Sequence, residues 1–157
     1  MGRFIVLVGA ILALWMCAGR WLFGIGGPLT WWYAPTIGLV FVALHLWLAR
    51  RVGVTRARGK RIGRSTIVAL SLAWACAVGF GLTVPDLVGD ELVSVLSLAA
   101  GSAFSGEMSI ALCNPLGILA FALVIASIAF AYADARDPKP EEDEYPGEGE
   151  MVRHPLE

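Results

Sequence analysis

Four long apolar segments, separated by short polar ones, restrict this chain to few folds. They cover about residues 4–23, 32–49, 65–84 and 108–132. Each approaches the roughly 20 residues that an α-helix needs to cross a bilayer core about 30 Å thick. Hydrophobic residues make up 57% of the chain and charged residues only 16%, a balance too apolar for a water-soluble domain. The sequence therefore predicts an all-α integral membrane bundle of four transmembrane helices within residues 1–133.

The first two segments carry features of the membrane interface. The first is long enough only if it continues past Arg20, whose side chain we expect to extend outward to the lipid headgroups. The second begins beside Trp31 and Trp32 and has Trp47 near its other end. Tryptophan is enriched at both membrane–water interfaces. The second segment is therefore the best defined of the four.

A basic loop between the second and third segments sets the predicted orientation. Seven of the twelve basic residues lie between positions 50 and 64, and no acidic residue accompanies them. Loops of this kind stay on the cytoplasmic side, so we expect a multi-pass protein of the cell (plasma) membrane with both termini in the cytoplasm. Anionic lipid headgroups lie closer to this loop than any nucleic acid would, so we expect lipid contacts and no nucleic-acid partner. The expected headgroup-binding residues are Arg50, Arg51, Arg56, Arg58, Lys60, Arg61 and Arg64.

Residues 87–106 mix apolar residues with a polar stripe. Asp90, Ser94, Ser97, Gly101 and Ser105 follow one another at intervals of four, three, four and four residues. This spacing places them on one helix face, and we expect an amphipathic or re-entrant helix over about 87–104. The alternative is a short fifth span, which would move the C-terminal tail outside. After residue 133 the chain is rich in acidic residues, proline and glycine, so residues 134–157 are predicted to form a disordered tail.

Small residues predict how the helices pack. In lipid, helices associate by close contact, and small residues spaced by four allow it. The third segment repeats small residues at Ser65, Ala69, Ala73, Ala77 and Gly81, and the fourth has Ala122 and Ala126. We interpret these as helix contact faces, and any stripe that the monomer leaves uncovered as an oligomer interface.

Few residues within the segments could carry chemistry. Asn114 and Pro115 predict a kink in the fourth helix, with a binding or gating role or an interhelical hydrogen bond for Asn114 as alternatives. His45 is the only histidine in the four segments, so haem ligation is not expected, and it is interpreted as an interfacial or interhelical hydrogen-bonding residue with a proton relay as the alternative. We expect Arg20 to face the acids of the outer loops and to pair with one of them, with a weak cation site among these acids as the alternative.

Catalytic and cofactor motifs are not found. The chain has no GxSxG, HExxH or glycine-rich phosphate loop, and its three cysteines form no CxxC pair; no metal or cofactor is therefore predicted. The sequence favours a non-catalytic accessory or interaction subunit, associated with itself as a homo-oligomer or with a larger membrane protein complex. The alternative is an oligomeric small transporter or channel, with Asp90, Ser94 and Ser97 lining a polar path.

Overall fold

The computed structural model describes residues 1–136 and is mostly helical, as the sequence predicts. Four stretches are long and apolar enough to cross a membrane: Gly2–Phe23, Thr30–Ala57, Arg64–Thr83 and Gly106–Asp134. The first combines α1 (Gly2–Ala18) with the 3-10 helix η1 (Gly19–Phe23), and the third and fourth are α4 (Arg64–Thr83) and α6 (Gly106–Asp134). The second combines α2 (Thr30–Tyr33), the π-helical η2 (Ala34–Gly38) and α3 (Leu39–Ala57). The tail was predicted over residues 134–157; Asp134 is the last residue of α6, and residues 137–157 lie outside the described residues.

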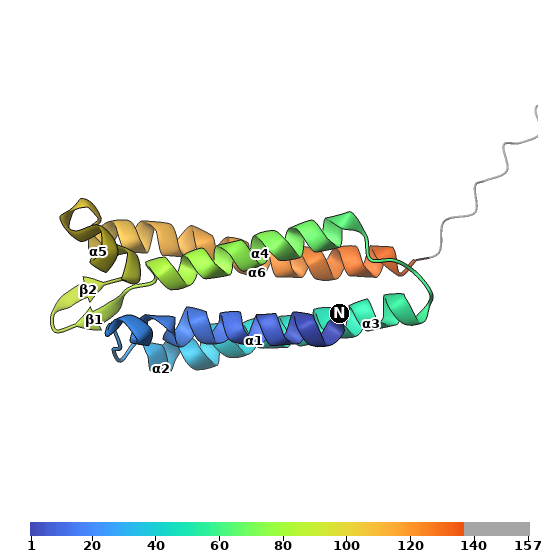
Figure 1. Cartoon of the computed structure of the whole chain (residues 1–157), viewed down its shortest axis with the longest axis horizontal. Coiled ribbons are helices and arrows are strands. Elements are labelled where there is room, and N and C mark those ends of the chain that lie inside the picture. The colour runs from blue at the N-terminus through green and yellow to red at the C-terminus, as the bar shows by residue number, and fades with distance from the viewer. Residues whose placement is uncertain (137–157) are drawn as a thin grey trace, which may run out of the picture.

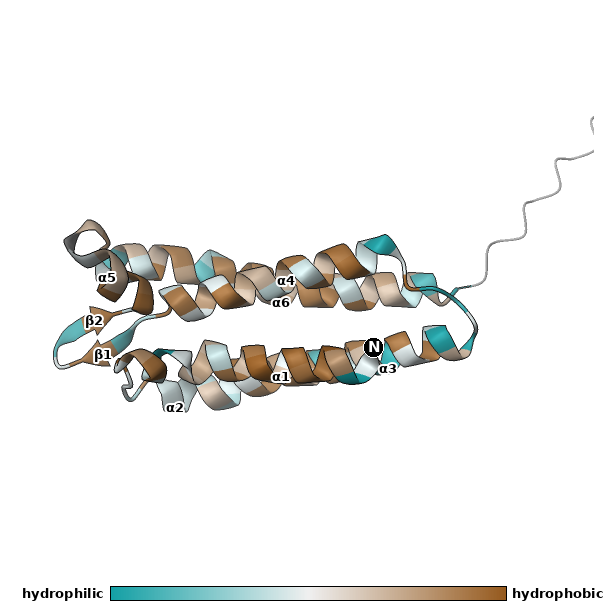
Figure 2. Cartoon of the chain, viewed as in Figure 1, coloured by the Kyte–Doolittle hydropathy of each residue, from teal (hydrophilic) through white to brown (hydrophobic). Residues whose placement is uncertain are grey.

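The four long helices lie side by side (Figure 1). Helix α1 packs against α3 and α4, and α6 packs against α4 and α3. The connections gather at two ends. We call one the hairpin end, because it carries η1 and the segment between α4 and α6, and the other the basic end, because it carries residues 50–64. Hydrophilic colours concentrate at these two ends, and the helices between them are largely hydrophobic (Figure 2).

The second stretch is longer than the sequence suggests. Helix α3 continues through Arg50 and Arg51 to Ala57, so the basic segment is half helix and half loop. At the other end, Pro35 lies in the π-helical turn, where its missing N–H disturbs the regular hydrogen-bond ladder. Gly38 follows, and a Cβ there would lie 2.9 Å from the sulfur of Cys17. The glycine therefore lets α1 approach this turn closely.

The expected amphipathic helix over 87–104 is wrong. Strands β1 (Asp86–Val88) and β2 (Glu91–Val93) pair antiparallel, with Val88 opposite Glu91. Gly89 has φ 65° in the two-residue turn between them, the positive φ that such hairpin turns require. A short helix, α5 (Val95–Ala100), and the 3-10 turn η3 (Gly101–Ala103) then lead to α6. The polar spacing that suggested a helix face belongs instead to a turn and two helix caps.

Small residues bring α4 into the core as predicted. Ala69, Ala73, Ala77 and Gly81 are buried, although Ser65 at the helix start is exposed. The expected alanine contact on α6 is not made within the monomer, because Ala122 is exposed and Ala126 only half buried, whereas Ala120 and Ala131 have no exposed surface. Helix α6 packs closely against α4 at Gly117, where a Cβ would lie 3.0 Å from the ring of Phe80. The buried face of α6 therefore lies a fraction of a turn from the alanine pair.

Candidate functional site

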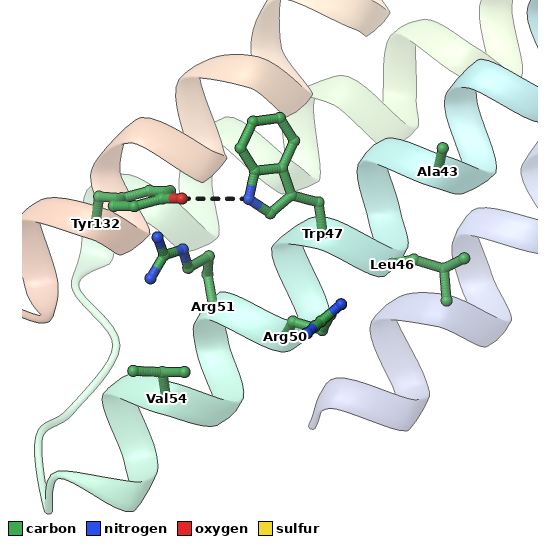
Figure 3. A pocket seen from close by; sticks show the side chains of 7 residues that line it. All are labelled: Ala43, Leu46, Trp47, Arg50, Arg51, Val54 and Tyr132. Atoms are coloured by element: carbon green, nitrogen blue, oxygen red, sulfur yellow. Dashed lines mark hydrogen bonds between the residues drawn. The ribbon is translucent and has the colours of Figure 1, made fainter.

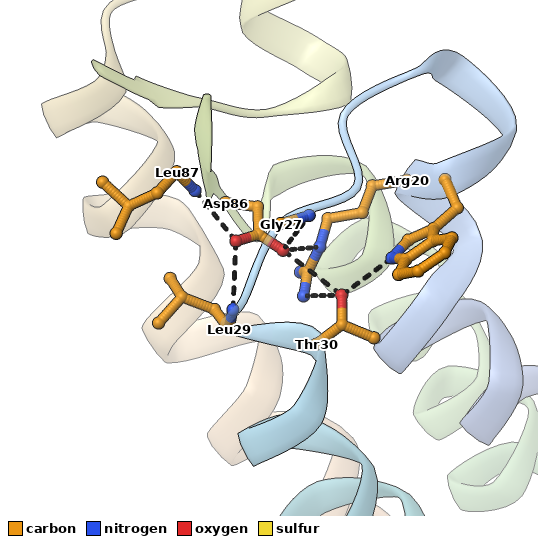
Figure 4. Close-up of polar contacts among 7 residues, drawn as sticks. Arg20, Gly27, Leu29, Thr30, Asp86 and Leu87 are labelled. Carbon is orange, nitrogen blue, oxygen red and sulfur yellow. Dashed lines mark hydrogen bonds and ion pairs between the residues drawn. The ribbon is translucent and has the colours of Figure 1, made fainter. Parts of the chain in front are cut away.

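A buried ion pair joins the loops at the hairpin end (Figure 4). Arg20 from η1 places Nε 2.9 Å from Oδ2 of Asp86, the first residue of β1. The exposed fractions of the two side chains are 1% and 0%. The pairing of Arg20 with a loop acid is as expected, but the expected extension toward lipid headgroups is wrong. The guanidinium instead lies inside the protein because its carboxylate partner is there.

Asp86 is held by four further hydrogen-bond donors. The backbone N–H groups of Gly27, Leu29 and Leu87 donate to its two oxygens over 3.2, 3.2 and 2.8 Å. The hydroxyl of Thr30 donates to Oδ2 over 3.2 Å. A Cβ at Gly27 would overlap the carboxylate, so only glycine allows the 24–29 loop to approach so closely. The carboxylate thus ties the α1–α2 loop to the strand that follows α4.

Thr30 completes this network, because one hydroxyl serves three partners. Its oxygen accepts from Nη2 of Arg20 over 3.1 Å and from the indole of Trp21 over 2.9 Å, while its proton goes to Asp86. The guanidinium also lies 4.9 Å from the centre of the Tyr33 ring, at a distance typical of a cation–π contact. Nη1 of Arg20 has no hydrogen-bond partner within the described chain. Arg20, Thr30 and Asp86 are buried and their acceptor atoms are occupied, so they suit a clamp and not a catalytic acid or base.

His45 forms a second buried polar contact, in the middle of the helices. Its Nδ1 lies 2.8 Å from the carbonyl of Phe41, and the indole of Trp74 on α4 donates to its Nε2 over 3.1 Å. These partners require the Nδ1–H tautomer, because Nε2 accepts. The ring has no exposed surface and packs so closely on α1 that a Cβ at Gly9 would overlap it. His45 therefore hydrogen-bonds between helices, and both ring nitrogens are already used.

Asn114 and Pro115 lie on an exposed part of α6. The helix continues through Pro115 without interruption, and both side chains are exposed. The thiol of Cys113 lies 3.8 Å from the Asn114 amide oxygen, a contact within the same helix. No hydrogen bond from Asn114 to another helix occurs within residues 1–136. The opposite residues on α4, around Phe80, are close to the end of that helix at Thr83, so Asn114 lies near the hairpin end.

The three polar residues expected to line a path do not lie along one path. Asp90 is exposed in the hairpin turn. The hydroxyl of Ser94 accepts from the backbone of Ser97 at the start of α5 and lies 2.7 Å from the hydroxyl of Ser109 on α6. Ser97 in turn accepts from the Ser94 backbone, which completes a capping box. These serines hold α5 on α6.

Basic residues at the other end complete the ends of α4 and α6. Arg58 and Lys60 donate to the carbonyl of Ala135, where α6 ends, and cations are favourable at helix C-termini. The carboxylate of Asp134 accepts from the Gly63 backbone over 2.8 Å and from the Thr66 hydroxyl over 2.7 Å. Asp134 thereby caps the start of α4. The end of α6 therefore provides a hydrogen-bond partner for the start of α4, and the basic loop beside them provides partners for the end of α6.

Two further arginines line a groove between α3 and α6 (Figure 3). The groove has a volume of about 460 Å³. The guanidinium of Arg51 lies 3.4 Å from the centre of the Tyr132 ring, and the indole of Trp47 donates to the Tyr132 hydroxyl over 3.3 Å. Arg50 lies on the same side of α3, and its side chain is exposed. Tyr132 thus holds one arginine and one tryptophan in place.

Sequence reasoning did not find the partners in these clusters. Asp86 is one of four acids in the outer loops, and only Pro85 before it marks the end of α4. Trp74 and Tyr132 are aromatic residues without a distinguishing motif. The described residues contain no group of three or more His, Cys, Asp or Glu side chains that could hold a metal ion, so the cation site considered for the outer acids has no geometric support there.

Comparisons with known proteins identify no relative. No protein-family model, no curated protein and no solved structure matches the chain.

Proposed function

We propose that the chain is a multi-pass protein of the plasma membrane, with both termini in the cytoplasm, that acts as a non-catalytic accessory or interaction subunit. The observation that carries this proposal is the packed interior. Leu12, Met16, Phe41, Ala73 and Val124 belong to one continuous buried cluster between the four helices. A protein with such an interior acts through its outer surface.

Membrane insertion is supported by what the helices leave outside. Large apolar side chains such as Leu14, Leu39 and Ile118 are more than half exposed along the helices. Water-soluble proteins rarely expose contiguous apolar surface of this extent. Within the described residues, buried polar side-chain atoms other than two nitrogens of Arg20 have hydrogen-bond partners, as Thr55 has in the carbonyls of Arg51 and Ala131, and lipid favours such an interior. The basic end, with seven cationic side chains, supports the cytoplasmic orientation.

The uncovered face of α6 supports association with another helix. Ala111, Pro115, Ile118, Ala122 and Ile125 are all exposed and recur at helical spacing. Small residues on such a face allow close helix contact in lipid. The proposed partner is a second copy of the chain or a helix of a larger membrane complex. The transporter alternative remains a prediction, and no contact described above favours it, since the serines it would use are engaged in capping.

Topology is tested with two single-cysteine reporters, made in a chain whose three native cysteines are replaced by alanine, and an impermeant thiol reagent. Asp90→Cys at the hairpin end should be labelled in intact cells, whereas Met151→Cys in the tail should react only after permeabilisation. Extraction with alkaline carbonate should leave the chain in the membrane pellet. Labelling of Met151→Cys in intact cells would refute the proposed orientation, and release by carbonate would refute insertion.

Association is tested by the mass of the protein purified in a mild detergent. Ala122→Leu should shift the assembly toward the monomer, because the larger side chain separates the helices. Ala10→Leu is the matched control, since Ala10 is exposed on α1. Two results would refute the proposed interface on α6: no cross-linked product of the native chain in native membranes, or the same detergent mass for both variants. Flux of ions through reconstituted vesicles would favour the transporter instead.

A further inference from the structure

The groove between α3 and α6 has the composition of a phosphate-binding site at a membrane surface. Arg50 and Arg51 supply two guanidinium groups within one turn of α3, and Trp47 and Tyr132 supply aromatic surface beside them. No acidic side chain from residues 1–136 lines the groove. The nearest acid along α6, Asp134, is already bonded to Gly63 and Thr66. The groove therefore carries an unbalanced positive charge.

The two guanidinium groups are available to a ligand. Within residues 1–136, Arg50 forms no hydrogen bond or ion pair with the protein, and the partner of Arg51 is Tyr132 alone. Arg51 lies against the Tyr132 ring, and because a guanidinium has five N–H donors, its contact with Tyr132 leaves others that can bind a ligand. Arginine donors in this arrangement match phosphate oxygens in a bidentate manner. Contact with the Tyr132 ring also limits the movement of the Arg51 side chain, so less conformational entropy is lost when a ligand binds.

The apolar part of the groove distinguishes a lipid from a soluble anion. Ala43 and Leu46 line it one to two turns before the arginines, toward the middle of α3, and both are exposed. A phosphate held at Arg50 and Arg51 would place the acyl chains of its own lipid along these residues. The acidic tail of the chain has little apolar content to match this surface.

We infer that this groove binds an anionic phospholipid of the cytoplasmic leaflet, with the lipid phosphate at Arg50 and Arg51 and an acyl chain along Ala43 and Leu46. The inference rests on the proposed membrane insertion. The sequence alone predicted lipid contacts for seven basic residues, whereas this inference assigns one lipid to the groove at Arg50 and Arg51. Anionic lipids are concentrated in this leaflet and attract basic segments next to a membrane helix.

The test measures lipid selectivity of the full chain in phosphatidylcholine bilayers. Spin-labelled phosphatidylglycerol and spin-labelled phosphatidylcholine report the relative association constant of each lipid at the protein surface. Arg50→Gln/Arg51→Gln should lower the preference for phosphatidylglycerol at least fivefold, as expected for basic side chains near a charged membrane surface. Arg61→Gln/Arg64→Gln removes the same charge from the same end and should change it less than twofold.

A third variant separates a built site from general attraction. Tyr132→Leu keeps every charge but removes the ring under Arg51, and should lower the preference about two- to fivefold. Circular dichroism and melting temperature identify any variant that fails to fold, and Tyr132→Phe, which keeps the ring, should retain the preference. Equal losses in the two double-arginine variants would overturn the inference, because they would indicate diffuse charge alone.

The acidic tail is the competing occupant. Neutralising Glu141, Glu142, Asp143 and Glu144 as Gln or Asn in the full chain should leave the lipid preference unchanged. A severalfold increase would mean that the tail occupies the groove and would refute the lipid assignment. Flotation of the same vesicles reports insertion. A chain that floats without lipid preference refutes this site only, whereas a chain that does not float refutes the membrane proposal as well.

Discussion

Breaking the buried pair between Arg20 and Asp86 should be among the most damaging single changes in the protein. Both side chains are at most 1% exposed, so removing one charge leaves the other buried without compensation. For buried pairs this costs about 3–5 kcal/mol. We expect this loss of unfolding free energy for Arg20→Gln and for Asp86→Asn.

The two variants should differ in a direction that the hydrogen bonds determine. Asn at position 86 retains one acceptor oxygen, but its amide nitrogen cannot accept from Gly27 or Thr30 at Oδ2. At a net value of about 1 kcal/mol per hydrogen bond, Asp86→Asn should cost roughly 1–2 kcal/mol more than Arg20→Gln. The double variant has no uncompensated charge and should lose no more than Asp86→Asn alone.

The assay is reversible unfolding in mixed micelles, titrated with a denaturing detergent and followed by helical circular dichroism. Asp90→Asn is the control, because it neutralises an exposed acid of the same hairpin and should change stability by less than about 0.5 kcal/mol. Losses below about 1 kcal/mol for both single variants would show that the pair behaves as a surface ion pair. A double variant whose loss equals the sum of the single losses would show that the two groups are not coupled.

Two further predictions concern helix contacts and helix ends. Gly9→Ala should destabilise the protein by about 1–3 kcal/mol, because the new Cβ overlaps the His45 ring. Gly53→Ala is the control: its new Cβ meets nothing within 4 Å, so the change should be neutral or stabilising by up to about 1 kcal/mol. Melting temperatures in detergent, read through the reactivity of the buried cysteines, compare the two, and an equal effect would contradict the packing. Asp134→Ala should cost about 1–2 kcal/mol and raise hydrogen exchange at the start of α4; unchanged exchange there would exclude a capping role.

The four apolar stretches could be predicted because length and hydropathy alone determine them. Their ends were harder to place. The sequence suggested that the second helix stops where the arginines begin, yet α3 continues to Ala57. Arginine is a good helix former, and cations near a helix C-terminus are favourable. The first arginines therefore do not mark the end of this helix.

The hairpin was missed because two patterns overlap in one segment. Polar residues at intervals of three and four suggested a helix, whereas Gly89-Asp90 between short apolar runs is a signal for a two-residue hairpin turn. The turn prevails here because Asp86 must stay extended to reach Gly27 and Leu29. Such a contact joins residues almost 60 positions apart, and no local pattern encodes it. The same limit applies to Trp74 and Tyr132, whose roles depend on a neighbouring helix.

The two ends of the molecule treat charge in opposite ways, and this has a consequence for how each responds to its surroundings. At the hairpin end Arg20 and Asp86 neutralise each other out of solvent, so salt and lipid charge should have little effect on that geometry. At the basic end Arg50 and Arg51 have no counter-charge within the described chain, and the free energy of that end depends on the anions around it. If the groove binds an anionic lipid as inferred, changes in lipid composition should therefore alter the basic end and leave the hairpin end as it is.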